Sequence, residues 1–124
     1  MSNHRDIVLD AGLFNILRHE QDLATTEIAI GDNLLIHPWI DKLVRLNKSF
    51  IVRRGLSIKG RLTASKHMSE YIHYCINEKG ESVWIAQREG RAKNSDARTQ
   101  DSTLKMLALY PDDKSFLESL KDLT

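Results

Sequence analysis

Helical and strand-like patterns of hydrophobic residues alternate along the chain. Residues 8–20 place apolar side chains at helical spacings, whereas residues 26–30 form a short β-branched run that ends in a glycine turn. The same reasoning predicts further helices over residues 38–47, 61–77, 104–110 and 115–123, and further strands over residues 49–53 and 83–86. We expect Gly55 and Gly60 to bracket a loop before the third helix, and residues 88–100 to form a polar loop.

The predicted order is helix, strand, helix, strand, helix, strand, helix, helix. Strands separated by helical crossovers indicate an α/β fold with a mostly parallel or mixed sheet of about three strands. Ligands of such sheets bind beyond the carboxyl ends of the strands. Basic residues follow two predicted strands, at residues 53–55 and 88–91, and the polar residues 3–6 precede the first helix. We therefore expect a ligand site at that edge of the sheet.

The composition predicts one soluble globular domain, because 124 residues are 41% hydrophobic and 28% charged. It excludes a disordered chain, and no apolar run approaches the roughly 18–20 residues of a membrane span. We expect no signal peptide, because charged side chains interrupt residues 1–10. The single Cys75 can form no internal disulfide, and we expect a buried structural thiol.

The net charge of +1 is unevenly distributed along the chain. Residues 1–40 carry a net charge of −4, residues 41–98 hold thirteen Lys or Arg against six acids, and residues 99–124 carry −2. A basic central region indicates either an anionic ligand or a solvated basic face, and charge by itself favours neither.

The histidine His4 lies close in sequence to two carboxylates, Asp6 and Asp10, at the start of the first predicted helix. A histidine can act as a general base near neutral pH when a carboxylate orients its ring. The alternative is that Asp6 or Asp10 caps the helix and that His4 belongs to a frayed terminus.

Two further groups of residues could bind an anion. Arg53 and Arg54 end an apolar strand, where their planar guanidinium groups could bind a phosphate in bidentate fashion or simply meet solvent. Glu89, Gly90 and Arg91 follow the third strand. The glycine permits close approach of the backbone, and the glutamate can hold an arginine or a hydroxyl group.

The other histidines and the second tryptophan favour structural roles. His67 and His73 are six residues apart rather than four, and His37 precedes a proline, so we expect no metal site. Trp84 lies mid-strand between apolar neighbours and is expected to pack in the core. The chain contains no Walker loop and no nucleophile elbow.

Read in order, the three polar groups resemble the motifs of the glycerolipid acyltransferase superfamily. That superfamily carries a His-x4-Asp motif, a Phe-x-x-Arg motif and a Glu-Gly-x-Arg motif, and Phe50 with Arg53 fits the second at its proper spacing. His4 resembles the first, although position 9 is Leu9, and residues 89–91 resemble the third, although the arginine comes one residue early. The strings NKSFIVRRG and VWIAQREGRAK are similar to a bacterial branch, and the resemblance spans about residues 2–107.

The resemblance implies transfer of a fatty acyl group from a thioester donor to a hydroxyl of glycerol 3-phosphate or lysophosphatidate. It assigns His4 as the general base and Asp10, or alternatively Asp6, as the carboxylate that orients it. The implied substrate-binding residues are Phe50, Arg53, Arg54, Glu89, Gly90 and Arg91. Acyl-CoA or acyl carrier protein would be the co-substrate, with no bound cofactor or metal, and the protein would lie in the cytoplasm at the inner face of the membrane.

The resemblance also indicates a single, incomplete acyltransferase domain over residues 1–124, because only three residues precede His4 and a further family motif is not matched. We therefore expect little turnover from this chain by itself. The alternative function is a non-catalytic basic module that binds anionic membrane or nucleic acid, although the interleaved exposed aromatic residues that a platform for single-stranded nucleic acid needs are not expected. A degenerate structural remnant is a third possibility.

Overall fold

Three parallel strands form the centre of the structure, a computed structural model that describes residues 9–32, 35, 37–46, 48–53, 57–86 and 100–124. The strands are β1 (Glu27–Gly31), β2 (Ser49–Val52) and β3 (Val83–Trp84), in the spatial order β2-β1-β3. β1 lies between the others, pairing Ala29 with Phe50 of β2 and Ile28 with Trp84 of β3. The predicted α/β fold with a parallel sheet is confirmed.

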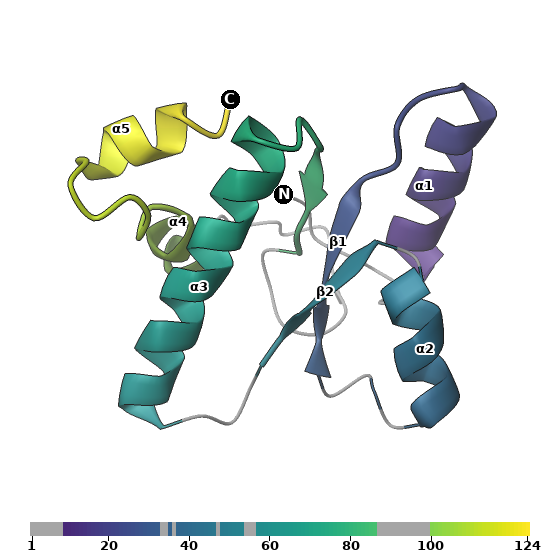
Figure 1. Cartoon of the computed structure of the whole chain (residues 1–124), viewed down its shortest axis with the longest axis horizontal. Coiled ribbons are helices and arrows are strands. Elements are labelled where there is room, and N and C mark those ends of the chain that lie inside the picture. Colours follow the sequence, from purple (N-terminus) through teal and green to yellow (C-terminus); the bar gives the residue numbers. More distant parts are fainter. Residues whose placement is uncertain (1–8, 33–34, 36, 47, 54–56, 87–99) are drawn as a thin grey trace.

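Helices cover both faces of this sheet (Figure 1). They are α1 (Leu9–Glu20), α2 (Pro38–Leu46), α3 (Ile58–Asn77), α4 (Asp101–Leu107) and α5 (Phe116–Lys121). α1 and α2 lie on one side of the strands, and α3, α4 and α5 lie on the other. The chain therefore leaves β1 through α2 toward β2, and then returns across β1 through α3 to reach β3.

The predicted order of eight elements is confirmed, but several boundaries differ from the expectation by up to three residues. β3 ends at Trp84 rather than at residue 86, and α4 begins at Asp101 rather than near residue 104. α3 begins at Ile58 rather than near residue 61, because the side-chain oxygen of Ser57 accepts a hydrogen bond from the backbone N–H of Gly60 at 3.3 Å. Gly60 is thus helical and does not border a loop, so that expectation was wrong. The other glycine of the expected loop, Gly55, lies outside the described residues.

α4 also ends earlier than expected, at Leu107 rather than near residue 110. The carbonyl oxygen of Leu107 accepts a hydrogen bond from the hydroxyl of Ser69 at 2.9 Å and lies 3.1 Å from Nε2 of His73. The backbone N–H of Tyr110 then donates to the same serine oxygen at 3.2 Å. Side chains of α3 therefore supply hydrogen-bond partners for the backbone groups at the end of α4.

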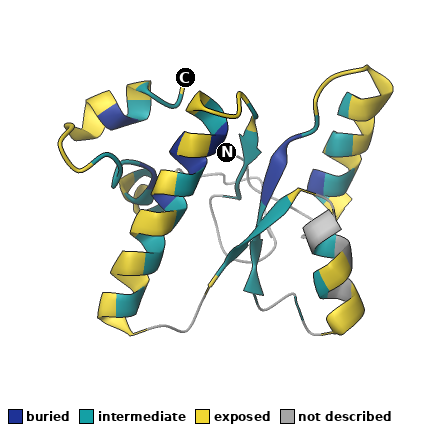
Figure 2. Ribbon diagram, viewed as in Figure 1, coloured by how far each residue is buried: buried dark blue, intermediate teal, exposed yellow. Residues whose placement is uncertain are grey.

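The best-buried side chains lie on the part of α3 that faces α4 and the sheet (Figure 2). Ile72, Cys75, Ser69 and His73 are all at most 3% exposed. Cys75 and His73 have the structural roles expected from the sequence, since one is a buried thiol and the other a hydrogen-bonded core histidine. Burial raises the pKa of the Cys75 thiol, which disfavours the reactive thiolate.

α1 is attached to β1 through one asparagine. The side-chain oxygen of Asn15 accepts hydrogen bonds from the backbone N–H and the hydroxyl of Thr26, at 2.9 and 2.8 Å, and its amide donates to the carbonyl of Thr26 at 3.1 Å. Ala11 is the buried residue of this helix, whereas Leu13 and Leu17 are more than half exposed. The apolar stripe that predicted α1 therefore faces away from the sheet.

Replacing Asn15 should detach α1 from the sheet. In Asn15→Ala, the buried polar groups of Thr26 lose their partners, so we expect the free energy of unfolding to fall by about 1–3 kcal/mol. Urea denaturation followed by circular dichroism measures this change. The matched control is His19→Ala, an exposed position on the same helix, which should change stability by less than about 0.5 kcal/mol. Equal effects of the two substitutions would contradict this account of the attachment.

Candidate functional site

The carboxyl ends of the strands lie at one edge of the sheet, because all three strands are parallel. β1 ends at Gly31, and β2 ends at Val52 in the register position next to it. Arg53 follows directly and is exposed to solvent. The structure thus places a permanently charged guanidinium group at the edge where α/β sheets bind their ligands.

Three of the predicted site residues fall within the described part of the chain. Asp10 lies half-buried in the first turn of α1, a position where a carboxylate also interacts favourably with the helix dipole. Phe50 lies on β2, and its ring meets that of Tyr71 on α3 edge-on, with centroids 5.2 Å apart. Phe50 therefore packs between β2 and α3, and this contact fixes the strand that carries Arg53.

The remaining predicted site residues lie outside the described residues. They are His4, Asp6, Arg54, Glu89, Gly90 and Arg91. Whether they converge with Asp10 and Arg53 stays a prediction. Their sequence positions agree with the topology in one respect, since residues 89–91 follow β3, whose carboxyl end lies at the same edge as that of β2.

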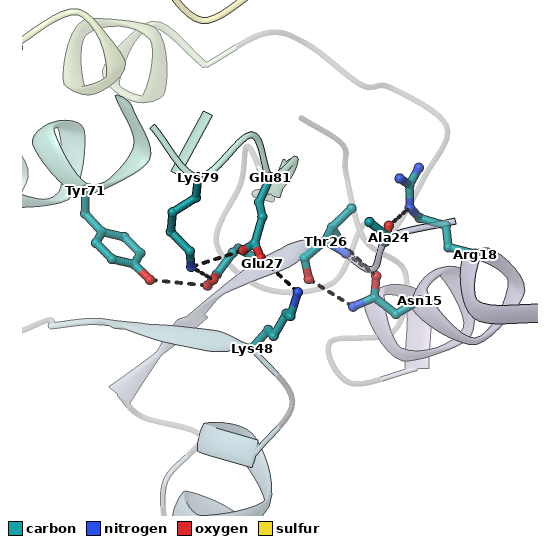
Figure 3. A network of polar contacts seen from close by, with 9 residues as sticks. All are labelled: Asn15, Arg18, Ala24, Thr26, Glu27, Lys48, Tyr71, Lys79 and Glu81. Carbon is teal, nitrogen blue, oxygen red and sulfur yellow. Dashed lines mark hydrogen bonds and ion pairs between the residues drawn. The ribbon is translucent and has the colours of Figure 1, made fainter. Parts of the chain in front are cut away.

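The opposite edge of the sheet holds a polar network that the sequence reading missed (Figure 3). Its centre is Glu27, the first residue of β1, which is only 4% exposed. The Lys79 ammonium donates to one carboxylate oxygen of Glu27 at 2.7 Å, and the hydroxyl of Tyr71 donates to the other at 3.4 Å. Lys79 also lies 3.1 Å from the Glu81 carboxylate, which accepts a hydrogen bond from Lys48 at 2.9 Å.

This amino-edge network joins four parts of the chain: β1, α3, the connection between α3 and β3, and the residue before β2. Its charges stabilise one another. Hydrogen bonds from Lys48 and Lys79 hold the pKa of Glu81 at about 2, below its usual 4.5. Hydrogen bonds to Glu27 and Glu81 raise the pKa of Lys79. Burial is the main reason that the pKa of Tyr71 is raised to about 12.

The pKa values of Tyr71, Lys79 and Glu81 all move away from neutrality, so these three groups are poorly suited to proton transfer near pH 7. The ion pairs and hydrogen bonds of the network join distant parts of the chain, which is a structural role. One signal in the sequence could have pointed to it: Glu27 is a charged residue inside the apolar run of β1, and a buried charge requires partners.

Metal binding and membrane spanning can both be examined in the described residues. Within the described ranges, no group of three or more His, Cys, Asp or Glu side chains is arranged to hold a metal ion. None of the helices in the described part of the chain is both long enough and apolar enough to cross a bilayer.

Comparisons with protein-family models, with curated proteins and with solved structures found no match. The class of protein that the structure defines is a small parallel α/β fold with a basic residue at the carboxyl edge of its sheet. The resemblance to the glycerolipid acyltransferases stays a prediction that rests on the motifs.

Glu81 should make stability depend on pH in the acid range. Its pKa is lower in the folded chain than its usual 4.5, so the stability it contributes is present above pH 4.5 and is lost as the pH falls toward 2. In Glu81→Gln, the midpoint of urea denaturation should be lower than that of the unsubstituted protein above pH 4.5. It should also fall less steeply as the pH is lowered from 4.5 toward 2.

The matched control for this measurement is Glu78→Gln, an exposed carboxylate three residues earlier that forms no ion pair with the described residues. It should keep the pH profile of the unsubstituted protein. Parallel profiles for Glu81→Gln and the unsubstituted protein would show that the amino-edge network contributes no pH-dependent stability.

Proposed function

We propose that this protein is an acyltransferase domain that moves a fatty acyl group from a thioester donor to a hydroxyl of glycerol 3-phosphate or lysophosphatidate. One observation carries the proposal most strongly: Arg53 lies exposed at the carboxyl end of β2, at the motif spacing from Phe50. A guanidinium group at this edge suits the phosphate of such an acceptor. Acyl-CoA or acyl carrier protein would supply the acyl group.

In this proposal, His4 removes the proton of the acceptor hydroxyl as its oxygen attacks the thioester carbonyl, and the thiolate of the donor leaves. Asp10, or alternatively Asp6, orients the imidazole and stabilises its protonated form. A thioester is already activated, so the transfer requires neither a covalent enzyme intermediate nor a metal ion. The reaction therefore depends mainly on a base and on correct positioning of the acceptor.

Positioning is the proposed task of the basic residues. Arg53, Arg54 and Arg91 would hold the phosphate, while Glu89 and Gly90 would shape the binding site around the acceptor. Phe50 would act through packing, since its contact with Tyr71 holds the end of β2 against α3. Because the lipid acceptor and product belong to a membrane, we place the protein in the cytoplasm, in peripheral contact with the inner face of the membrane.

The second candidate function is a non-catalytic basic module. The thirteen Lys or Arg against six acids in residues 41–98 favour it, because such a charge excess attracts anionic surfaces in general. Its binding would fall steeply with salt and would not depend on His4. Of its two possible ligands we favour membrane over nucleic acid.

Arg53 should determine acceptor binding. We expect Arg53→Ala to weaken binding of glycerol 3-phosphate about tenfold or more, because a charged hydrogen bond is lost, and Arg53→Lys to restore part of it. Calorimetric titration of the full chain measures the dissociation constant. Lys105→Ala, which removes an exposed cation on α4, is the control and should leave it unchanged. If Arg53→Ala and Lys105→Ala weaken glycerol 3-phosphate binding equally, the result would favour the non-catalytic basic module.

His4 should determine the rate of transfer rather than acceptor binding. Because we expect little turnover from this chain by itself, the test uses a longer form of the protein in which activity is recovered. There, we expect His4→Ala to lower kcat by about 10²–10⁴-fold, the usual contribution of a general base, at an unchanged dissociation constant for the acceptor. Release of the donor thiol, followed spectroscopically, reports the rate. A kcat that does not change in His4→Ala would remove the proposed base.

A further inference from the structure

The first half of α3 exposes two large hydrophobic side chains on one face. Ile58 is 87% exposed, which is the largest value among the exposed large hydrophobic residues of the described chain, and Leu62 is 65% exposed. The two residues are four positions apart, so they lie one above the other on the helix surface. Figure 2 shows this end of α3 as mostly exposed.

This apolar face continues a face that is covered further along the helix. Ser69 follows Leu62 by seven residues, about two helical turns, and therefore lies on the same side of α3. α4 covers that side through the contacts of Ser69 and His73 with Leu107. In Figure 1, α3 extends beyond α4 at its first turns, so Ile58 and Leu62 lie beyond the reach of this packing.

Basic side chains flank the exposed face on both sides. Helical geometry places Lys59 and Lys66 on one side of the line through Ile58 and Leu62, and Arg61 on the other. No acidic residue occurs between residues 57 and 66. Residues 57–66 thus carry three cations and no acid, and one of these cations, Lys66, forms an ion pair with Asp112.

We propose that this basic apolar surface, Ile58, Lys59, Arg61, Leu62 and Lys66, docks on an anionic lipid bilayer. An apolar stripe between cations is the pattern of helices that lie in the membrane interface, where the apolar side chains enter and the cations meet lipid phosphates. The protein's own residues 87–99 are unsuited to cover it, because they include no large apolar side chain and carry four Arg or Lys against two acids.

Another exposed apolar surface among the described residues, on α1, suits this partner less well. Leu13 and Leu17 are 55% and 56% exposed, but the helix and the turn that follows it carry three carboxylates, Asp10, Glu20 and Asp22, against one arginine, Arg18. These carboxylates would be repelled by anionic lipid. Charge therefore distinguishes the two apolar surfaces, and it selects the α3 surface for an anionic membrane.

Docking through α3 would bring the candidate site to the lipid. Arg53 follows the last residue of β2 and comes only five residues before Ile58, the first residue of α3. A lipid acceptor held by the membrane would then present its phosphate to Arg53. This consequence rests on the proposed function, whereas the docking itself stands on the exposure and charge of α3.

Vesicle sedimentation of the full chain, with no acyl donor present, tests the docking. We expect binding to phosphatidylglycerol-containing vesicles and little binding to pure phosphatidylcholine vesicles. Ile58→Ser with Leu62→Ser should weaken binding about tenfold or more, and Lys59→Gln about fivefold. Raising the salt from about 0.1 M to about 1 M should also weaken it, because the Debye length falls from about 10 Å to about 3 Å.

The matched control is Leu13→Ser with Leu17→Ser, which removes equally apolar, exposed side chains from the acidic surface of α1. This variant should bind anionic vesicles as the unsubstituted protein does, and circular dichroism checks that both double variants are folded. The proposal is overturned if the control loses binding while the α3 variant keeps it, or if the unsubstituted protein does not bind. Concentration-dependent self-association that the α3 variant abolishes, without vesicle binding, would assign the surface to protein contact instead. Vesicle binding by a chain that does not bind glycerol 3-phosphate would reject the proposed function and leave the docking intact.

Discussion

The fold depends on one buried charge, the carboxylate of Glu27 on the central strand. A carboxylate removed from water is costly unless ammonium or hydroxyl groups replace its hydration, and here Lys79 and Tyr71 supply them. Lys79 in turn holds Glu81, and Glu81 holds Lys48. Satisfying Glu27 therefore requires β1, α3 and the connection before β3 to meet at the same end of the sheet, and the link through Glu81 adds the residue before β2.

The two edges of the sheet consequently have different tasks. At the amino edge, opposite charges pair with one another, and the pKa values of Lys79 and Glu81 move away from neutrality. At the carboxyl edge, the guanidinium group of Arg53 is exposed to solvent. An exposed cation at this edge is what the proposed phosphate site requires.

α3 runs from one of these edges to the other, and its two halves have different surroundings. Its second half is buried against α4 and the sheet through Ser69, Ile72 and His73. Its first half projects past that packing and combines apolar exposure with positive charge. The same helix therefore contributes to the core at one end and, at the other, offers a surface that begins five residues after Arg53 in the chain. Membrane docking and the candidate site are linked in our proposals for this reason.

Local sequence patterns determined the order of the helices and strands and the parallel sheet, because periodicity and turn residues act within a few positions. They also identified Arg53 as a strand-end residue and Cys75 as buried. Only the tertiary structure decided that Glu27 pairs with Lys79, 52 residues away, and that the apolar stripe of α1 faces outward while Asn15 attaches the helix to β1. Pairings over such distances follow from the spatial order of the strands, and no local pattern of residues encodes that order.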